Sequence, residues 1–114
     1  MSTKYKIRDQ EQLYFVSFAV VYWLDVFVRN EYREVLLDSL RFCQKNKGLE
    51  VFAWCIMTSN VHLIIGTTDK KMEDILRDFK SYTSTQLRKV ISQNQQESRR
   101  EWLLEMMKKA GKNN

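Results

Sequence analysis

The stretch MTSNVHLIIG, residues 57–66, combines an apolar strand pattern with the only histidine of the chain. Its apolar residues at positions 61, 63 and 65 would share one face of a strand, because side chains alternate between faces. Asn60 and His62 are two residues apart and would share the opposite face, with backbones about 7 Å apart. The spacing predicts a strand with a core-facing apolar side and an open side that carries an amide beside an imidazole.

Strand and helix patterns follow each other in a regular order around this stretch. The predicted elements are a strand over 13–21, a helix over 30–48, strands over 49–57 and 61–67, and helices over 69–93 and 98–110. Asn30 is expected to cap the first helix and Gly48 to close it in the left-handed conformation. Ser98 and Glu101 are expected to form a capping box for the last helix, which Gly111 would end.

This order is most of a split βαββαβ, or ferredoxin-like, unit. We therefore predict an α+β fold with an antiparallel sheet that lacks its final strand, in a single domain over residues 1–114. The strand over 49–57 is almost continuously apolar, which indicates burial on both faces, or on one face against a partner. A sheet that is not closed has an open edge, and such an edge favours pairing between chains.

The composition narrows the class of partner. The formal net charge of +5 and the sequence pI near 9.3 favour an anionic partner such as nucleic acid. Cys43 and Cys55 have no metal-site spacing and indicate free thiols in a reducing cytoplasm. No apolar run approaches the roughly 18 residues of a membrane helix.

The stretch IMTSNVHLII resembles the signature of the HUH tyrosine transposases, in particular the REP-associated group of the IS200-like transposase superfamily. That signature contains a His-hydrophobic-His motif, onto which Asn60, Val61 and His62 fall. The stretches YFVSFAVVYWLDVF, LRFCQKNKGLEVFAWCIM, DILRDFKSYTS and ESRREWLLEMMKKAG resemble the same family in the same order. The resemblance covers residues 13–111.

The resemblance implies a metal-dependent reaction on DNA. Two histidines of the motif would hold Mg²⁺ or Mn²⁺, which polarises a phosphate of single-stranded DNA. A tyrosine would attack the phosphorus and form a covalent phosphotyrosine link, from which the strand can be rejoined. The resemblance also implies hairpin DNA as the ligand and a homodimer as the working form.

The sequence departs from this family pattern in two ways. Asn60 stands in place of a histidine, and an amide oxygen is a weaker metal ligand than an imidazole. The stretch resembling YIHNNPV, which carries the nucleophile of the relatives on a later helix, does not occur. We therefore expect the metal pair Asn60 and His62 to be impaired, and strand cleavage to be weakened or lost.

Other residues are candidates for roles in the site. Tyr82 could substitute as nucleophile, although we favour an ordinary helix-surface tyrosine. The candidate DNA-binding cations are Arg77, Lys80, Arg88, Arg99 and Arg100.

Three functional hypotheses remain open at this stage. The first is a degenerate transposase that still binds single-stranded DNA. In the second, Asn60 and His62 hold a metal with a third group, and Tyr82 or a partner chain supplies the nucleophile. The third is a non-enzymatic ferredoxin-like module that binds protein or RNA, for which indifference to single-stranded DNA would be the distinguishing result.

Overall fold

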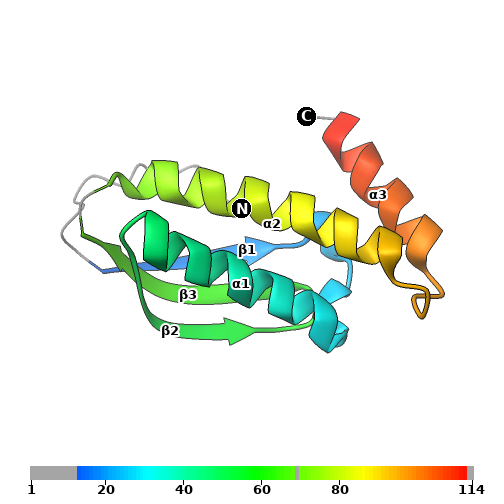
Figure 1. Ribbon diagram of the computed structural model, residues 1–114, viewed down its shortest axis with the longest axis horizontal. Coiled ribbons are helices and arrows are strands. Elements are labelled where there is room, and N and C mark those ends of the chain that lie inside the picture. Colours follow the sequence, from blue (N-terminus) through cyan, green and yellow to red (C-terminus); the bar gives the residue numbers. More distant parts are fainter. Residues whose placement is uncertain (1–12, 69, 113–114) are drawn as a thin grey trace.

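The computed structural model describes residues 13–68 and 70–112. Its elements in chain order are β1 (Tyr14–Ala19), the 3₁₀ turns η1 (Val21–Trp23) and η2 (Val26–Val28), α1 (Asn30–Asn46), β2 (Leu49–Ile56), β3 (Asn60–Thr67), α2 (Met72–Gln93) and α3 (Arg100–Lys112). Figure 1 shows α1 and α2 lying along one face of the sheet, with α3 at the end of the molecule where α2 finishes. None of the helices in the described ranges is both long and apolar enough to cross a membrane.

The sheet has the strand order β1-β3-β2, and both strand pairs are antiparallel. β3 therefore lies in the centre, between two strands that are far apart in the sequence. Within the part of the chain that the structure describes, the outer edges of β1 and β2 have no strand beside them. The predicted α+β fold with an antiparallel sheet is confirmed, and the three strands of the described ranges are consistent with a split βαββαβ order that lacks its final strand.

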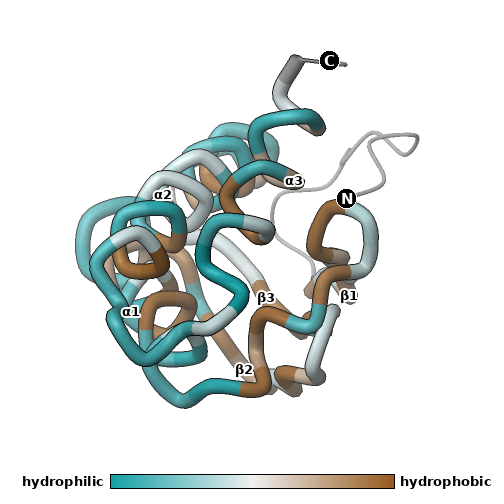
Figure 2. The backbone as a smooth tube through the Cα atoms, turned by 90° about the vertical axis from the view of Figure 1, so that its right-hand side faces the viewer, coloured by the Kyte–Doolittle hydropathy of each residue, from teal (hydrophilic) through white to brown (hydrophobic). Residues whose placement is uncertain are grey.

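Alternation along β3 separates the two faces of the sheet. Val61, Leu63 and Ile65 are at most 2% exposed and pack into the core under the helices, as their spacing predicts. Figure 2 shows α1 and α2 on one side of the three strands, so among the described residues the helices cover only one face of the sheet. On the open face, Phe15 of β1 is 68% exposed and Phe52 of β2 is 56% exposed.

The expectation that β2 is buried on both faces is wrong. β2 is an edge strand, and Phe52, Ala53, Trp54 and Cys55 are all exposed. The helices cover only one face of the sheet and β3 only one edge of this strand. The strand also has an irregular register between Val51 and Ala53. The other expectation, that one face of this apolar strand packs against a partner chain, stays a prediction.

Several helix boundaries differ from the prediction, whereas the closing residue of α1 agrees with it. The N-cap of α1 is Arg29 rather than Asn30, whose side-chain oxygen instead accepts a hydrogen bond from Arg33 within the helix. Gly48 has a φ of 73°, the predicted left-handed closing conformation. α3 continues through Gly111 to Lys112, so the predicted end at residue 110 is wrong. The predicted start at residue 69 lies outside the described residues, and α2 begins at Met72.

The N-terminal end of α3 is capped by Glu97 rather than by the predicted capping box. Its carboxylate accepts a hydrogen bond from the Arg99 backbone amide at 3.2 Å. The same side chain is 1% exposed and accepts hydrogen bonds from Arg29 Nε and the Tyr32 hydroxyl, each at 3.0 Å. Glu97 therefore joins the start of α1 to the start of α3. This contact between distant elements takes the place of the capping box predicted for Ser98 and Glu101.

Candidate functional site

His62 lies at the centre of a row of three side chains that crosses the open face. In the sheet register, Ser17 of β1 and Cys55 of β2 are the direct partners of His62. Directly paired residues of antiparallel strands point to the same face, so the three polar side chains are neighbours. We call Ser17, His62 and Cys55 the His62 row.

The imidazole of His62 is fixed by two residues of β1. Ser17 Oγ and His62 Nδ1 are hydrogen-bonded at 2.8 Å. The ring of Phe15 stacks on the imidazole, with ring centroids 5.9 Å apart and an angle of 22° between the planes. Nε2 is therefore the ring nitrogen of His62 left for a ligand.

Asn60 begins β3 and lies opposite Ala19 of β1. It shares the open face with His62, as the spacing of two residues predicts. Its side-chain oxygen is buried and has no hydrogen-bond partner among the described residues. The amide is therefore close to His62 along the strand, but its oxygen is not presented to solvent.

Tyr82 lies in the helical layer, on the other side of the sheet from His62. Its ring stacks on Phe42 of α1, with centroids 5.3 Å apart and an interplanar angle of 7°. This parallel stack joins α1 and α2 on the helical side of the sheet. The fold thus does not bring Tyr82 to the His62 row within one chain.

The predicted DNA-binding cations fall into two groups. Arg77, Lys80 and Arg88 all belong to α2, on the helical side of the sheet, and Arg77 is paired with Asp74 at 3.2 Å. Arg99 and Arg100 lie where α3 begins.

Arg99 is held by acidic side chains. Its guanidinium contacts Asp25 at 2.5 Å and Glu97 at 3.5 Å. The hydrogen bond from Arg99 lowers the pKa of Asp25 below its ordinary value. Arg100 donates to the backbone oxygen of Asn94 at 3.4 Å and has no carboxylate partner within 4.0 Å in the described ranges. Arg100 is therefore the more available cation of the two.

Sequence reasoning missed Ser17 and Phe15. Their contacts with His62 depend on the register between β1 and β3, which are 45 residues apart at the Ser17–His62 hydrogen bond. The spacing of two residues between Phe15 and Ser17 in the predicted strand was the only local signal. This spacing predicts that Phe15 and Ser17 share one face of the strand, but it does not predict that they contact His62.

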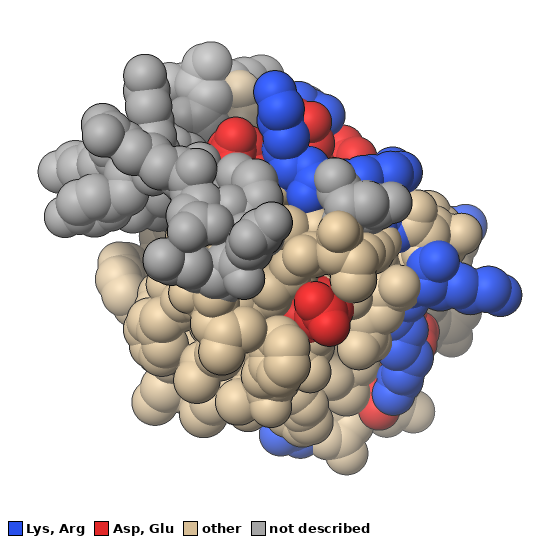
Figure 3. All heavy atoms as spheres, turned by 90° about the vertical axis from the view of Figure 1, so that its left-hand side faces the viewer, with Lys and Arg blue, Asp and Glu red and all other residues tan. Residues whose placement is uncertain are grey.

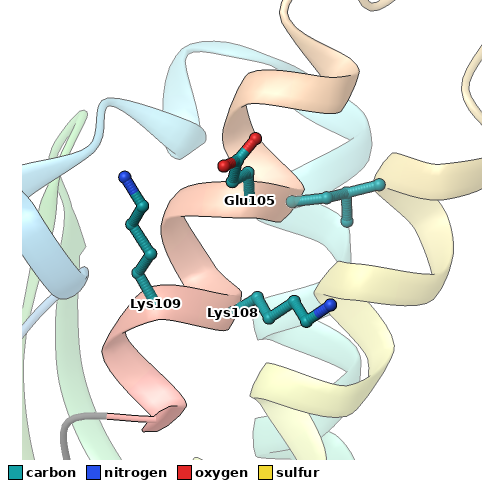
Figure 4. Close-up of a pocket in the computed structure, with 4 residues that line it drawn as sticks. Glu105, Lys108 and Lys109 are labelled. Atoms are coloured by element: carbon teal, nitrogen blue, oxygen red, sulfur yellow. The ribbon is translucent and has the colours of Figure 1, made fainter.

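An open pocket of about 350 Å³ lies on α3, away from the His62 row. Leu104, Glu105, Lys108 and Lys109 line it. Figure 4 shows the side chains of Lys108 and Lys109 pointing away from each other. The two cations therefore do not converge on a common ligand, and we assign no site there.

Comparison with known proteins identifies the family. A family model for IS200-like transposases matches residues 12–105 of the chain. The crystal structure of a Deinococcus radiodurans R1 protein, described as a candidate transposase, matches with a TM-score of 0.62 at 24% sequence identity. The match covers 81% of this chain and 73% of that one. A search of curated proteins found no match. The chain belongs to the IS200-like transposase family, and the solved structure shares its α+β fold.

Members of this family generally use a divalent metal ion, but the side chains around His62 do not fit one. Mg²⁺ and Mn²⁺ are bound chiefly through carboxylate and water oxygens, whereas the His62 row offers one imidazole, one hydroxyl and one thiol. The Asn60 oxygen that would complete a pair with His62 is buried. Across the described residues, no three His, Cys, Asp or Glu side chains are grouped closely enough to hold a metal ion. We therefore derive no metal-dependent step at this site.

Proposed function

We propose that this chain binds single-stranded DNA on the open face of its sheet, and that its strand cleavage and rejoining are weakened or lost. The observation that carries the proposal is the His62 row, with Phe15 stacked on His62, on a face that the helices leave uncovered. Membership of a transposase family makes DNA the expected ligand. The net charge of +5 supports an anionic partner.

Unpaired bases fit the exposed aromatic surface of this face. Phe15 presents an aromatic ring that is 68% exposed, and any base can stack on such a ring. A stacked base contributes about 1–3 kcal/mol, largely independent of its sequence. Ser17 and His62 beside it offer hydrogen-bonding groups to the sugar and phosphate of the same nucleotide. Duplex DNA hides its base faces, so the surface favours single strands.

The loss of cleavage follows from the donor set and from the position of Tyr82. The metal ligands that the family resemblance predicts are reduced to a single accessible imidazole nitrogen of His62. Tyr82 is stacked on Phe42 in the helical layer and does not reach the open face of its own chain. The proposal needs neither a bound Mg²⁺ or Mn²⁺ nor a tyrosine nucleophile.

Hairpin DNA with a single-stranded flank is the form of ligand that we propose. Arg77, Lys80 and Arg88 on α2 remain predictions for contacts with a paired stem that passes over the helical layer. Figure 3 shows a broad surface of mostly uncharged side chains with an acidic side chain near its centre, and Lys and Arg side chains, with acidic ones among them, along one side of it. A homodimer in the cytoplasm, with both cysteines as thiols, completes the proposal.

A binding titration by fluorescence anisotropy tests this function. A labelled hairpin with a single-stranded tail would be compared with a duplex of equal length at two salt concentrations. We expect tighter, salt-sensitive binding to the tailed hairpin. Phe15→Ala should weaken that binding about tenfold, because one base loses its stacking partner.

Phe42→Ala is the matched control, because Phe42 is 41% exposed but lies on α1 in the helical layer. It should leave the affinity for the tail unchanged. Equal affinity of the wild-type chain for hairpin and duplex would contradict the proposal. So would equal effects of the two phenylalanine variants.

A second candidate function is a non-enzymatic module that binds protein or RNA. The unpaired edge of β2, with Phe52 and Trp54 more than half exposed, favours it. The same titration separates the two, since indifference to single-stranded DNA would favour this second function.

A further inference from the structure

The 3₁₀ turn η1 presents two large aromatic side chains in an unusual backbone conformation. Tyr22 and Trp23 each have a φ of 54°, a region that bulky residues rarely adopt. Tyr22 is 50% exposed and Trp23 is 66% exposed. Consecutive bulky residues keep such a conformation only where the surrounding structure imposes it.

The surroundings of η1 do impose it. The Val20 amide donates to the Ser59 carbonyl, and the Phe27 amide donates to the Thr58 carbonyl, each at 2.9 Å. The first bond holds the residue before η1, and the second holds η2, to the loop that precedes β3. Leu24, directly after the turn, is 5% exposed and anchors the segment in the core. The fold therefore holds the two aromatic rings outward.

The first turn of α3 adds a third aromatic side chain and a cation. α3 contacts η1, and both lie at the same end of the sheet (Figure 1). Trp102 on this turn is 51% exposed. Arg99 ties the turn to Asp25, just after η1, while Arg100 next to it has no carboxylate partner within 4.0 Å in the described part of the chain.

We propose that Tyr22, Trp23 and Trp102, which we call the aromatic corner, stack on unpaired bases of single-stranded DNA while Arg100 contacts a phosphate. The inference rests on the proposed function and extends it from the open face to the end of the sheet. β1 ends at Ala19, opposite Asn60, and the chain then continues into η1. A DNA strand bound at the His62 row and running along β1 in this direction would therefore reach the aromatic corner. Exposed aromatic rings and a guanidinium that has no carboxylate partner in the described part of the chain match the alternation of base and phosphate, which favours nucleic acid over a protein partner.

The test compares Trp23→Ala with Trp54→Ala. Trp54 is the matched control because it is 55% exposed, like Trp23, but lies on the edge strand β2. The probe is a labelled single strand of about 12 thymidines, within the usual site size of such proteins. Trp23→Ala should weaken binding about tenfold, and Trp54→Ala should not change it. Trp23→Phe keeps an aromatic ring and should restore most of the affinity.

An abasic strand of the same length separates stacking from charge. Without bases to stack, the wild-type chain and Trp23→Ala should bind it equally. Arg100→Gln should instead reduce the salt dependence of binding by about one phosphate contact on both strands.

The outcomes also separate this inference from the proposed function. If the wild-type chain binds no single strand, the proposed function fails and the inference fails with it. If the wild-type chain binds the single strand and Trp23→Ala binds it as tightly, only the aromatic corner is overturned. That second result would assign the corner to protein contacts.

Discussion

The hydrogen bond between Ser17 and His62 leaves one imidazole nitrogen for a ligand, and this limits what the open face can bind. A second donor at Asn60 would have to come from an oxygen that is buried in the present structure. The backbone positions of both residues nevertheless suit a pair of ligands, because residues two apart on β3 share a face. The missing element is therefore the side chain at position 60 and not the strand that carries it.

Asn60→His is expected to create a measurable metal site. A second imidazole on the same face would add a nitrogen ligand to that of His62, and two ligands that converge on one Mn²⁺ hold it more tightly than a single ligand does. We expect at least about tenfold tighter Mn²⁺ binding than in the wild-type chain, measured by isothermal titration calorimetry. His62→Ala in the same background should remove the gain. An Asn60→His variant with wild-type affinity for Mn²⁺ would show that the pair cannot converge.

The sequence was sufficient to predict that Asn60 and His62 share a face of the strand, but not to predict which side chains contact them. Alternation along β3 is a local property, so it could be predicted from the stretch itself. The contacts of His62 with Ser17 and Phe15 depend on strand register, which is set by the packing of the whole sheet.

Glu97 is the side chain that connects separate elements of the fold. It lies between α2 and α3, yet it contacts Arg29 and Tyr32 at the start of α1. Asn94, just after α2, also donates to the Tyr32 hydroxyl at 3.0 Å. The orientation of α3, and with it the position of Arg100 and Trp102, depends on this network.

Glu97→Gln is expected to lower the free energy of unfolding by about 2 kcal/mol at neutral pH, because buried charge-assisted hydrogen bonds are lost. Burial acts to raise the pKa of Glu97, but hydrogen bonds from the Arg99 amide and the Tyr32 hydroxyl, with the charges of Arg29 and Arg99, lower it overall. The carboxylate is thus more acidic in the folded chain than in the unfolded chain. Its stabilisation is present above the ordinary pKa of 4.5 and is lost as the pH falls through the lower folded value.

Thermal unfolding between about pH 7 and pH 3 measures both effects. The melting temperature of the wild-type chain should fall more steeply below pH 4.5 than that of Glu97→Gln. The pKa values of Asp25 and Asp78 are also lowered, but these groups are present in both chains and their effects cancel in the comparison. Parallel pH profiles for the two chains would refute the role assigned to Glu97.

The sequence predicted the helices and strands better than the connecting segments and the contacts between them. The apolar stripe of α2, including Met72, Ile75 and Phe79, is buried as its period predicts. The turn η1 lies between the predicted strand over 13–21 and the predicted helix over 30–48, and no local pattern predicts it, because Tyr22 and Trp23 carry no glycine signal for a positive φ. Glu97 and Arg29 are 68 residues apart, so no local pattern could pair them.

In the described ranges, helices cover one face of the sheet and leave the other open, and several large apolar side chains on the strands are exposed. Phe15, Phe52 and Ile64 are all at least 36% exposed on the strands. An apolar edge strand such as β2 is a template for pairing with another chain. Family membership suggests oligomers, and a second copy of the chain could pair with the edge of β2.

Phe52→Lys is expected to shift the chain from dimer toward monomer, because a charge on an edge strand opposes pairing between copies. Sedimentation velocity at concentrations of about 1 to 100 µM would measure the shift as a change in the dimer fraction of up to about tenfold. Phe42→Lys, on the helical side, serves as the control and should leave the dimer fraction unchanged. A dimer that is indifferent to Phe52→Lys would place the interface away from this edge.

The two cysteines of the molecule lie in contrasting positions, and the contrast makes the His62 row chemically addressable. Cys55 is exposed in that row, whereas Cys43 is 1% exposed, and burial raises the pKa of its thiol. Alkylating reagents react with accessible thiolates, so a maleimide fluorophore or a nitroxide spin label should attach to Cys55 alone. The wild-type chain thus carries its own attachment point beside His62, and a spectroscopic signal from that point would follow occupancy of the open face without an engineered cysteine.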